Sequence, residues 1–209
     1  MATIALFHSV LGVRDGVRAA ADVLRDAGHA VTVVDQYDGR VFEDYAEASR
    51  YADEEVGMPA LAAAALQAVE GMPDDLVPMG FSNGGGMAQW VALHRPVAAA
   101  VLVAGVIAPR WLETLEPGLQ WPVGVPAQSH YARRDPFRDD GAVEEFGAFL
   151  GAAGATLEHH WYEGDSHLFT DASLPAEYDP AATDLLWERV LGFLDRLGPD
   201  GLEALDDEV

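Results

Sequence analysis

The sequence predicts an α/β fold, in which a mostly parallel sheet of about six strands carries helices on both faces. Short apolar runs rich in β-branched residues recur along the chain, and segments with helical spacing of apolar residues separate them. One strand-to-helix junction also carries the motif G-F-S-N-G at residues 80–84. Right-handed crossovers favour the strand order 2-1-3-4-5-6, with a reversal between the first and third strands. Ligands bind at such a reversal, beyond the carboxyl ends of the strands.

The expected elements follow one another with short connections. The strand-like runs are residues 3–8, 30–35, 76–81, 97–104, 125–131 and 157–162. The helical segments are residues 14–27, 59–69, 83–95, 142–153 and 180–197, and the polar stretch 36–58 leaves room for a short helix. The buried stripe of the last helix is expected at Leu185, Leu186, Val190, Leu191 and Leu194. Residues 1–198 are therefore predicted to form one domain, followed by an acidic tail at 199–209.

Pro78 conflicts with part of this prediction. Proline has no N–H to donate to a ladder, so its presence in the third strand argues against a central position. The surrounding strand, turn and helix outweigh that objection in our interpretation.

The motif at residues 80–84 has the form G-x-S-x-G, which is typical of a nucleophile elbow. A serine in such a turn adopts a strained backbone that lifts its hydroxyl clear of the sheet, and glycines on either side avoid collisions. The helix that follows directs its amide dipoles at the site. The alternative is a glycine-rich turn with a helix-capping serine at Ser82, but the flanking strand and helix favour the elbow.

A serine hydroxyl needs a base within hydrogen-bonding reach, and the base needs an orienting carboxylate. In this arrangement they follow the serine in the order acid, then histidine, on loops after later strands. Asp135 follows the fifth predicted strand and His167 follows the sixth. Asp139 and Asp140 are rival carboxylates farther from the strand end, and Asp165 lies too close in sequence to His167 to be more than a helper.

The chain resembles the dienelactone hydrolase family of small α/β-hydrolases. The resemblance rests on HSVLG after the first strand, GFSNGG at the elbow, HYARRDPF after the fifth strand and YEGDSHLF after the sixth. It implies an α/β-hydrolase fold with Ser82 as nucleophile, His167 as general base and acid, and Asp135 as its orienter. It also implies an oxyanion hole formed by the backbone amides of Val10 and Asn83.

Three departures from the family pattern bear on the substrate. Members with dienelactone activity carry cysteine at the position of Ser82 and a glutamate near the position of Ser9. They also tend to have a basic residue a few places after the histidine, where this chain reads Leu168-Phe169-Thr170-Asp171. The first two changes belong together, because a serine paired with histidine does not need that glutamate. The third argues against a dianionic dienelactone as the substrate.

Three further side chains are candidates for the substrate pocket. Tyr37 and Trp111 offer aromatic walls, although such aromatics are more often plain core. Arg40 could meet a substrate carboxylate, although a loop-bracing ion pair is the more ordinary role.

The histidines outside the predicted triad favour structural roles. His8 and His130 stand at strand ends near the predicted site, and His159 and His160 are adjacent, so their side chains point to opposite faces of a strand. With no H-x-x-x-H spacing and no cysteine, a metal site is not expected. No cofactor is expected either.

Composition narrows the classes of partner. A net charge of −23 argues against nucleic acid or an anionic membrane surface as a partner. The first ten residues lack the basic region of a signal peptide, so a cytoplasmic location is expected. The predicted function is a serine hydrolase that cleaves a small carboxylic ester, lactone or thioester through an acyl-enzyme. A catalytically silent ligand-binding protein and an acyltransferase are the alternatives, and a homo-oligomer is left open.

Overall fold

The computed structural model describes residues 1–197 and contains a six-stranded, all-parallel sheet in the order β2-β1-β3-β4-β5-β6. The strands are β1 (Thr3–Phe7), β2 (Ala30–Val34), β3 (Val77–Phe81), β4 (Ala100–Val103), β5 (Ala127–Ala132) and β6 (Leu157–Tyr162). The predicted strand order is therefore confirmed. The reversal lies at β1 and β3, so the carboxyl ends of these two strands adjoin the loop that holds Ser82.

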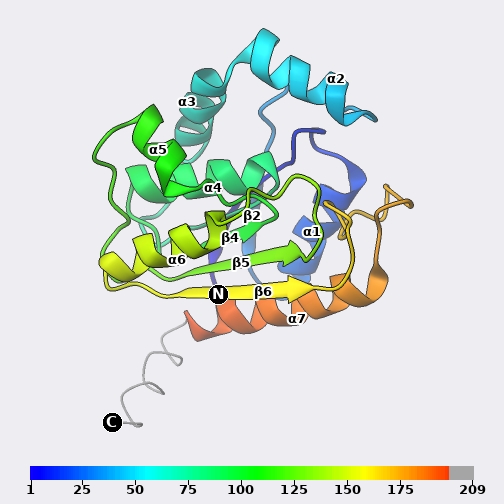
Figure 1. Cartoon of the computed structure of the whole chain (residues 1–209). Coiled ribbons are helices and arrows are strands. Elements are labelled where there is room, and N and C mark those ends of the chain that lie inside the picture. Colours follow the sequence, from blue (N-terminus) through cyan, green and yellow to red (C-terminus); the bar gives the residue numbers. More distant parts are fainter. Residues whose placement is uncertain (198–209) are drawn as a thin grey trace.

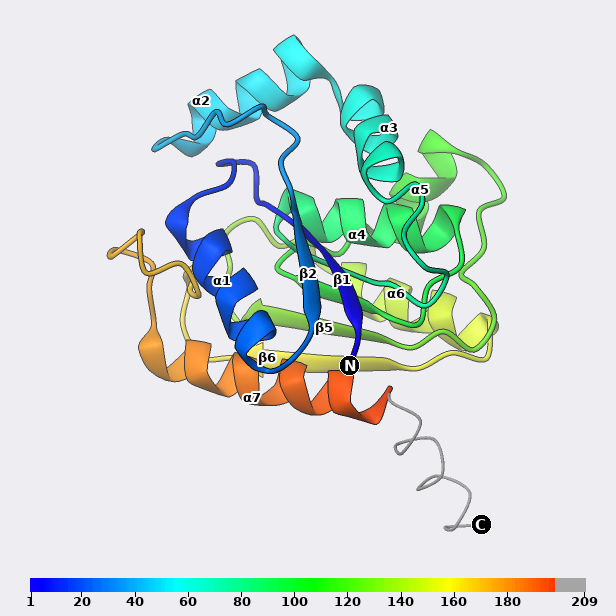
Figure 2. The ribbon, with the colours of Figure 1, turned by 180° about the vertical axis from the view of Figure 1, so that it is seen from behind.

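Helices cover both faces of the sheet. They are α1 (Asp15–Asp26), α2 (Tyr45–Arg50), the π-helix η1 (Tyr51–Val56), α3 (Met58–Ala68), α4 (Asn83–His94), α5 (Pro109–Leu115), α6 (Ala142–Ala152) and α7 (Pro180–Arg196). Figures 1 and 2 show α1 and α7 on one face and α3, α4 and α6 on the other, with α2 at the periphery. The five long predicted helices are present; α5 and η1 were not predicted.

Pro78 lies in a central strand despite the objection from its missing N–H. On one side it stands opposite Ala5 in β1. On the other side the pairing of β3 with β4 begins only at Met79, opposite Val101. Pro78 lies between this ladder and the hydrogen bond that the Ala98 amide donates to the Leu76 carbonyl at 3.0 Å, so its missing N–H falls in a gap of the pairing.

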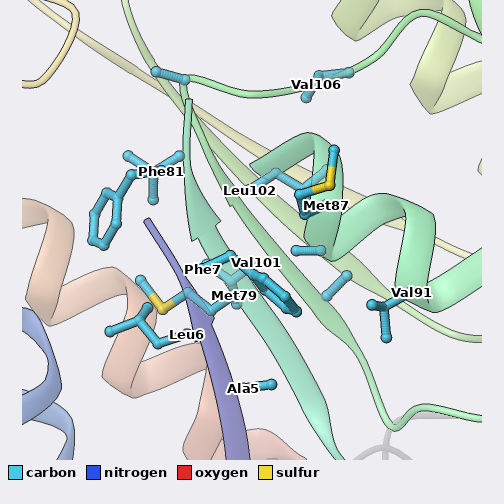
Figure 3. Close-up of a cluster of buried hydrophobic side chains, with 14 of the residues drawn as sticks. Ala5, Leu6, Phe7, Met79, Phe81, Met87, Val91, Val101, Leu102 and Val106 are labelled. Carbon is cyan, nitrogen blue, oxygen red and sulfur yellow. The ribbon is translucent and has the colours of Figure 1, made fainter. Parts of the chain in front are cut away.

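The core forms where α4 packs on the centre of the sheet. Figure 3 shows Met87 and Val91 of α4 beside side chains of β1, β3 and β4, including Phe7 and Leu102. These side chains are fully or almost fully buried, and their burial fixes α4 on the sheet with its N-terminus at the end of β3. On α7 the prediction for Leu185 is wrong, since this residue is 38% exposed and Phe193 is buried in the stripe instead.

A buried polar cluster lies between β5 and β6. His130 is completely buried, and its Nδ1 and Nε2 lie 2.8 Å from Tyr162 Oη and 2.9 Å from Gln128 Oε1. Because an amide oxygen only accepts, the Nε2–H donates to Gln128 and Nδ1 accepts from the Tyr162 hydroxyl. The neutral ring is thereby fully satisfied, which matches the structural role predicted for this histidine. Burial holds the pKa of His130 well below its usual value.

Stability is expected to fall in mild acid because several histidines are buried in their neutral form. Burial lowers the pKa of His8 and His130, and lowers the pKa of His159 to about 4. In the unfolded chain a histidine titrates near about 6.5, so below that pH the unfolded state binds protons that the folded state refuses. The free energy of unfolding should therefore drop as the pH falls from 7.5 to 5.5, with His130 contributing up to about 1.4 kcal/mol per pH unit. Urea unfolding at each pH measures this.

The matched variant is His159→Gln, which removes one of these rings and should flatten the pH slope. A free energy of unfolding that stays constant between pH 7.5 and 5.5 would contradict the assignment of neutral buried rings.

None of the helices within residues 1–197 is both long and apolar enough to cross a membrane. The acidic tail predicted at 199–209 lies outside the described residues.

Candidate active site

Ser82 occupies the turn between β3 and α4 in a strained conformation. Its φ of 53° and ψ of −120° are unusual for a residue other than glycine and cost on the order of 1–3 kcal/mol. Its carbonyl accepts from the amides of Gly85, at 2.8 Å, and Gly86, at 3.3 Å, so the serine is the N-cap of α4. Its amide donates to Val103 of β4 at 2.7 Å. The turn is thus fixed by the helix and by the neighbouring strand.

The two motif glycines permit close backbone contacts around this turn. A Cβ on Gly80 would lie 2.0 Å from the carbonyl oxygen of Gly84, and one on Gly84 would lie 2.4 Å from the carbonyl oxygens of Phe7 and His8. These contacts press the start of α4 against the end of β1. The predicted reason for the glycines is therefore present in the structure.

The structure brings the three predicted triad residues together. Ser82 Oγ lies 2.7 Å from His167 Nε2, and His167 Nδ1 lies 2.9 and 2.8 Å from the two carboxylate oxygens of Asp135. Because a carboxylate only accepts, Nδ1 carries a proton, and Nε2 is left with its lone pair facing the serine hydroxyl. This is the tautomer that can remove a proton from Ser82.

Asp135 and His167 are both buried and firmly held. The carboxylate of Asp135 is also an acceptor for the amide of Phe137, at 2.9 Å. The ring of Phe137 meets the His167 imidazole edge-on, with the ring centres 4.8 Å apart. The rival Asp139 accepts instead from the Trp111 indole at 2.9 Å.

A second pair of side chains supports the loop of His167. Glu177 accepts from the Tyr45 hydroxyl at 2.8 Å through one oxygen and from the Leu168 amide at 2.8 Å through the other. This carboxylate ties helix α2 to the residue that follows His167. Sequence reasoning missed Glu177, and no local motif signals it, because its two partners lie far apart along the chain.

The two amides predicted for an oxyanion hole are free to bind a ligand. Within residues 1–197, the amides of Val10 and Asn83 have no acceptor, whereas the Leu11 amide donates to Ser9 Oγ at 3.2 Å. The amide of Asn83 belongs to the first turn of α4, where helix amides lack an internal partner. Donors of this kind suit an oxygen that gains negative charge.

His8 fixes the loop that carries Val10. Its Nε2 accepts from the Gln36 amide at 3.1 Å, so its Nδ1 bears the proton and donates to the Ser9 carbonyl at 2.6 Å. The ring is fully buried, and burial lowers its pKa. A neutral His8 therefore orients the peptide between Ser9 and Val10.

A cavity of about 210 Å³ opens beside Ser82 and His167. It is lined by Val10, Tyr45, Ser49, Ala52, Asp53, Met58, Ser82, Asn83, Phe137 and His167. Asp53 is the charged carboxylate of this wall, and no arginine or lysine is among the lining residues. The wall therefore offers no arginine or lysine as a partner for an anionic group.

The pocket residues predicted from sequence lie elsewhere. Tyr37 is buried against His8, with ring centres 4.6 Å apart, and does not line the cavity. Arg40 stacks over the Tyr51 ring at 4.4 Å and is not a lining residue. Trp111 is 55% exposed and also lies outside the lining.

Helix α2 and η1 supply much of the cavity wall instead. π-helical turns are rare and often occur at functional sites, and η1 contributes Ala52 and Asp53. Tyr45 and Ser49 come from α2. The sequence predicts a short helix in the polar segment 36–58, but it does not show which face of that helix lines the cavity.

Residues suited to a metal ion do not gather at this site. Across residues 1–197, no group of three or more histidine or acidic side chains is arranged to hold one.

Comparison with known proteins places the chain in a family. A model of the dienelactone hydrolase family matches residues 1–198. The chain belongs to the dienelactone hydrolase family. As a member of this family, the protein is a hydrolase of small ester-like substrates. No curated protein matches the chain by sequence.

Solved structures share the fold of this dienelactone hydrolase family member. A dienelactone hydrolase-like promiscuous phosphotriesterase from metagenomic libraries superposes with a TM-score of 0.76 at 21% identity, covering 94% of this chain and 87% of its own. A putative dienelactone hydrolase from Klebsiella pneumoniae gives 0.71 at 21% identity, covering 91% and 85%. The propionate-bound esterase 2 of Thermogutta terrifontis gives 0.66 at 18% identity, covering 94% and 84%. These likenesses show the α/β-hydrolase fold.

Proposed function

We propose that this family member is a serine hydrolase that cleaves a carboxylic ester, lactone or thioester through an acyl-enzyme. The observation that carries the proposal is the chain of contacts from Ser82 through His167 to Asp135, at 2.7 Å and 2.8 Å. A helix-capping serine has no need of a histidine whose free nitrogen faces its hydroxyl.

The reaction follows from these positions. Ser82 Oγ attacks the carbonyl carbon of the substrate while its proton passes to His167 Nε2. The carbonyl oxygen takes the electron pair and is stabilised by the amides of Val10 and Asn83. Collapse of this intermediate expels the alcohol or thiol, which takes the proton from His167 and leaves the acyl group on Ser82.

Water completes the cycle by the same steps. His167 removes a proton from a water molecule, whose oxygen attacks the acyl carbon. The intermediate then breaks its bond to Ser82 Oγ, the proton returns to the serine and the carboxylic acid departs. Asp135, buried beside the ring, stabilises the imidazolium in both halves.

An active-site-directed fluorophosphonate tests this proposal. It should attach covalently to Ser82, as read by mass spectrometry of the peptide, and Ser82→Ala should abolish labelling. Ser49 also lines the cavity and serves as the control, so Ser49→Ala should still be labelled at Ser82. Folded protein that takes up no probe would favour a silent ligand-binding protein.

A further inference from the structure

An apolar groove of about 390 Å³ lies next to the cavity at Ser82. Its walls come from α3, from one face of α4 and from the segment around α5. The lining residues are Met58, Pro59, Ala62, Ala63, Leu66, Met87, Trp90, His94, Ile107, Leu115 and Glu116. The triad does not use this groove.

One side chain separates the groove from the catalytic cavity. Met58 lines both hollows. Met58 is 37% exposed, and methionine is an unbranched, flexible side chain that adapts to irregular space, so the two hollows are separated by a side chain that can change rotamer. A ligand that begins at Ser82 can therefore extend past Met58 into the groove.

The direction of α4 gives this extension its length. Ser82 caps the N-terminus of α4, and Met87, Trp90 and His94 follow on the same helix. At 1.5 Å per residue, they lie about 8, 12 and 18 Å along the axis from the serine. His94 and Glu116 pair at 3.2 Å at the far end, where the apolar lining gives way to polar groups.

The groove wall opposite α3 is rigid. The carboxamide of Gln89 donates to the Ile107 carbonyl at 2.9 Å and accepts from its amide at 2.8 Å. Tyr131 Oη accepts from the neighbouring Val106 amide at 2.8 Å. The groove is thus held in shape by its own chain.

The cavity at Ser82 is too small by itself for an ordinary small-molecule ligand. Pockets for small molecules span about 300–1,000 Å³. The cavity at Ser82, about 210 Å³, falls short of that range, whereas the adjoining groove of about 390 Å³ lies within it, so a longer substrate has room to extend from one into the other. The lining is apolar except for His94 and Glu116 at one end, so its greater part suits a hydrocarbon chain.

We propose that the groove between α3, α4 and α5 binds an extended aliphatic chain of the ester substrate, so the enzyme prefers medium-chain to short-chain esters. This rests on the proposed hydrolase function. Each methylene buried in the groove adds about fourfold to kcat/KM, because burial stabilises the transition state and the bound substrate relative to free substrate.

The experiment measures kcat/KM for two substrate series. One holds p-nitrophenol constant and lengthens the acyl chain from acetyl to decanoyl. The other keeps the acetyl group constant and lengthens the alcohol, and its hydrolysis is measured by the release of acetic acid. A rise with length in one series identifies which part of the ester occupies the groove, and the rise should stop where the chain reaches the His94–Glu116 pair.

Two phenylalanine variants on α3 complete the test. Ala62→Phe fills the groove from its half-buried wall. It should lower the ratio of kcat/KM for the octanoyl ester to kcat/KM for the acetyl ester by at least tenfold, or the ratio for the octyl and ethyl acetates if the alcohol occupies the groove. Ala60→Phe adds the same side chain to an exposed position outside the groove lining and should preserve the ratio. If Ala62→Phe does not fold, Ala63→Trp at an exposed groove position replaces it.

The outcomes separate the two proposals. No hydrolysis of any ester and no fluorophosphonate labelling would overturn the hydrolase itself. Hydrolysis that is independent of chain length in both series, or equal ratios for Ala62→Phe and Ala60→Phe, would overturn only the groove assignment. A change in oligomeric state with Ala62→Phe and an unchanged ratio would also overturn it, because the groove would then be a contact between copies of the chain.

Discussion

Replacing Ser82 or His167 with alanine is expected to lower kcat by about 10⁴–10⁶-fold. In the proposed mechanism the serine hydroxyl is a weak nucleophile until the lone pair on His167 Nε2, 2.7 Å away, removes its proton. Removing either partner ends that step, so the double variant should be little slower than either single variant. Single-turnover and steady-state kinetics on one p-nitrophenyl ester measure all three.

The control for this comparison is folding. Urea midpoints close to that of the parent protein would show that the losses are chemical. Asp135→Asn should also lose orders of magnitude, because its amide can donate to Nδ1 and so favour the wrong histidine tautomer. Losses from Ser82→Ala and His167→Ala that multiply in the double variant would count against a shared step.

Val10→Pro is expected to lower kcat by about 10²–10³-fold with little change in KM. The predicted contact uses the backbone N–H of Val10, which proline lacks. That hydrogen bond strengthens as the carbonyl oxygen becomes negative, so its loss raises the barrier more than it weakens substrate binding. Measuring kcat and KM separately resolves the two effects.

Val10→Ala is the matched control and should remain active, because it keeps the N–H while shortening the side chain. A folded Val10→Pro variant with normal kcat would remove the Val10 amide from the oxyanion hole. So would a ligand-bound structure in which the amides of Val10 and Asn83 lie too far apart to donate to one oxygen.

The framework of the site was predictable because its constraints are local. A serine at positive φ needs neighbours without side chains, and Gly80 and Gly84 stand at the required positions. Alternating strands and helices leave few topologies, and in a parallel sheet the carboxyl ends of β3, β5 and β6 lie at the same edge. Asp135 and His167 follow from that placement.

The walls of the cavity were not predictable in the same way. Tyr37 and Tyr45 are aromatic residues of the same polar segment, yet Tyr37 packs into the core and Tyr45 lines the cavity. Which of the two faces Ser82 depends on the turns between them and on how α2 packs. No repeating pattern of apolar residues in the sequence reports either feature. The exposed position of Trp111 was not predictable either. Its helix, α5, has only seven residues, which is too short for the spacing of apolar residues to show which face is buried.

The π-helix η1 makes the cavity wall sensitive to a change of one residue in chain length. A π-turn holds one residue more than an α-turn, and each helical residue turns the chain by about 100°. Deleting one residue within Tyr51–Val56 would therefore convert the π-turn to an α-turn and rotate the residues on one side of the deletion, relative to those on the other, by about 100°. Such a change would alter what the cavity wall presents to a ligand and leave the sheet and the turn at Ser82 in place.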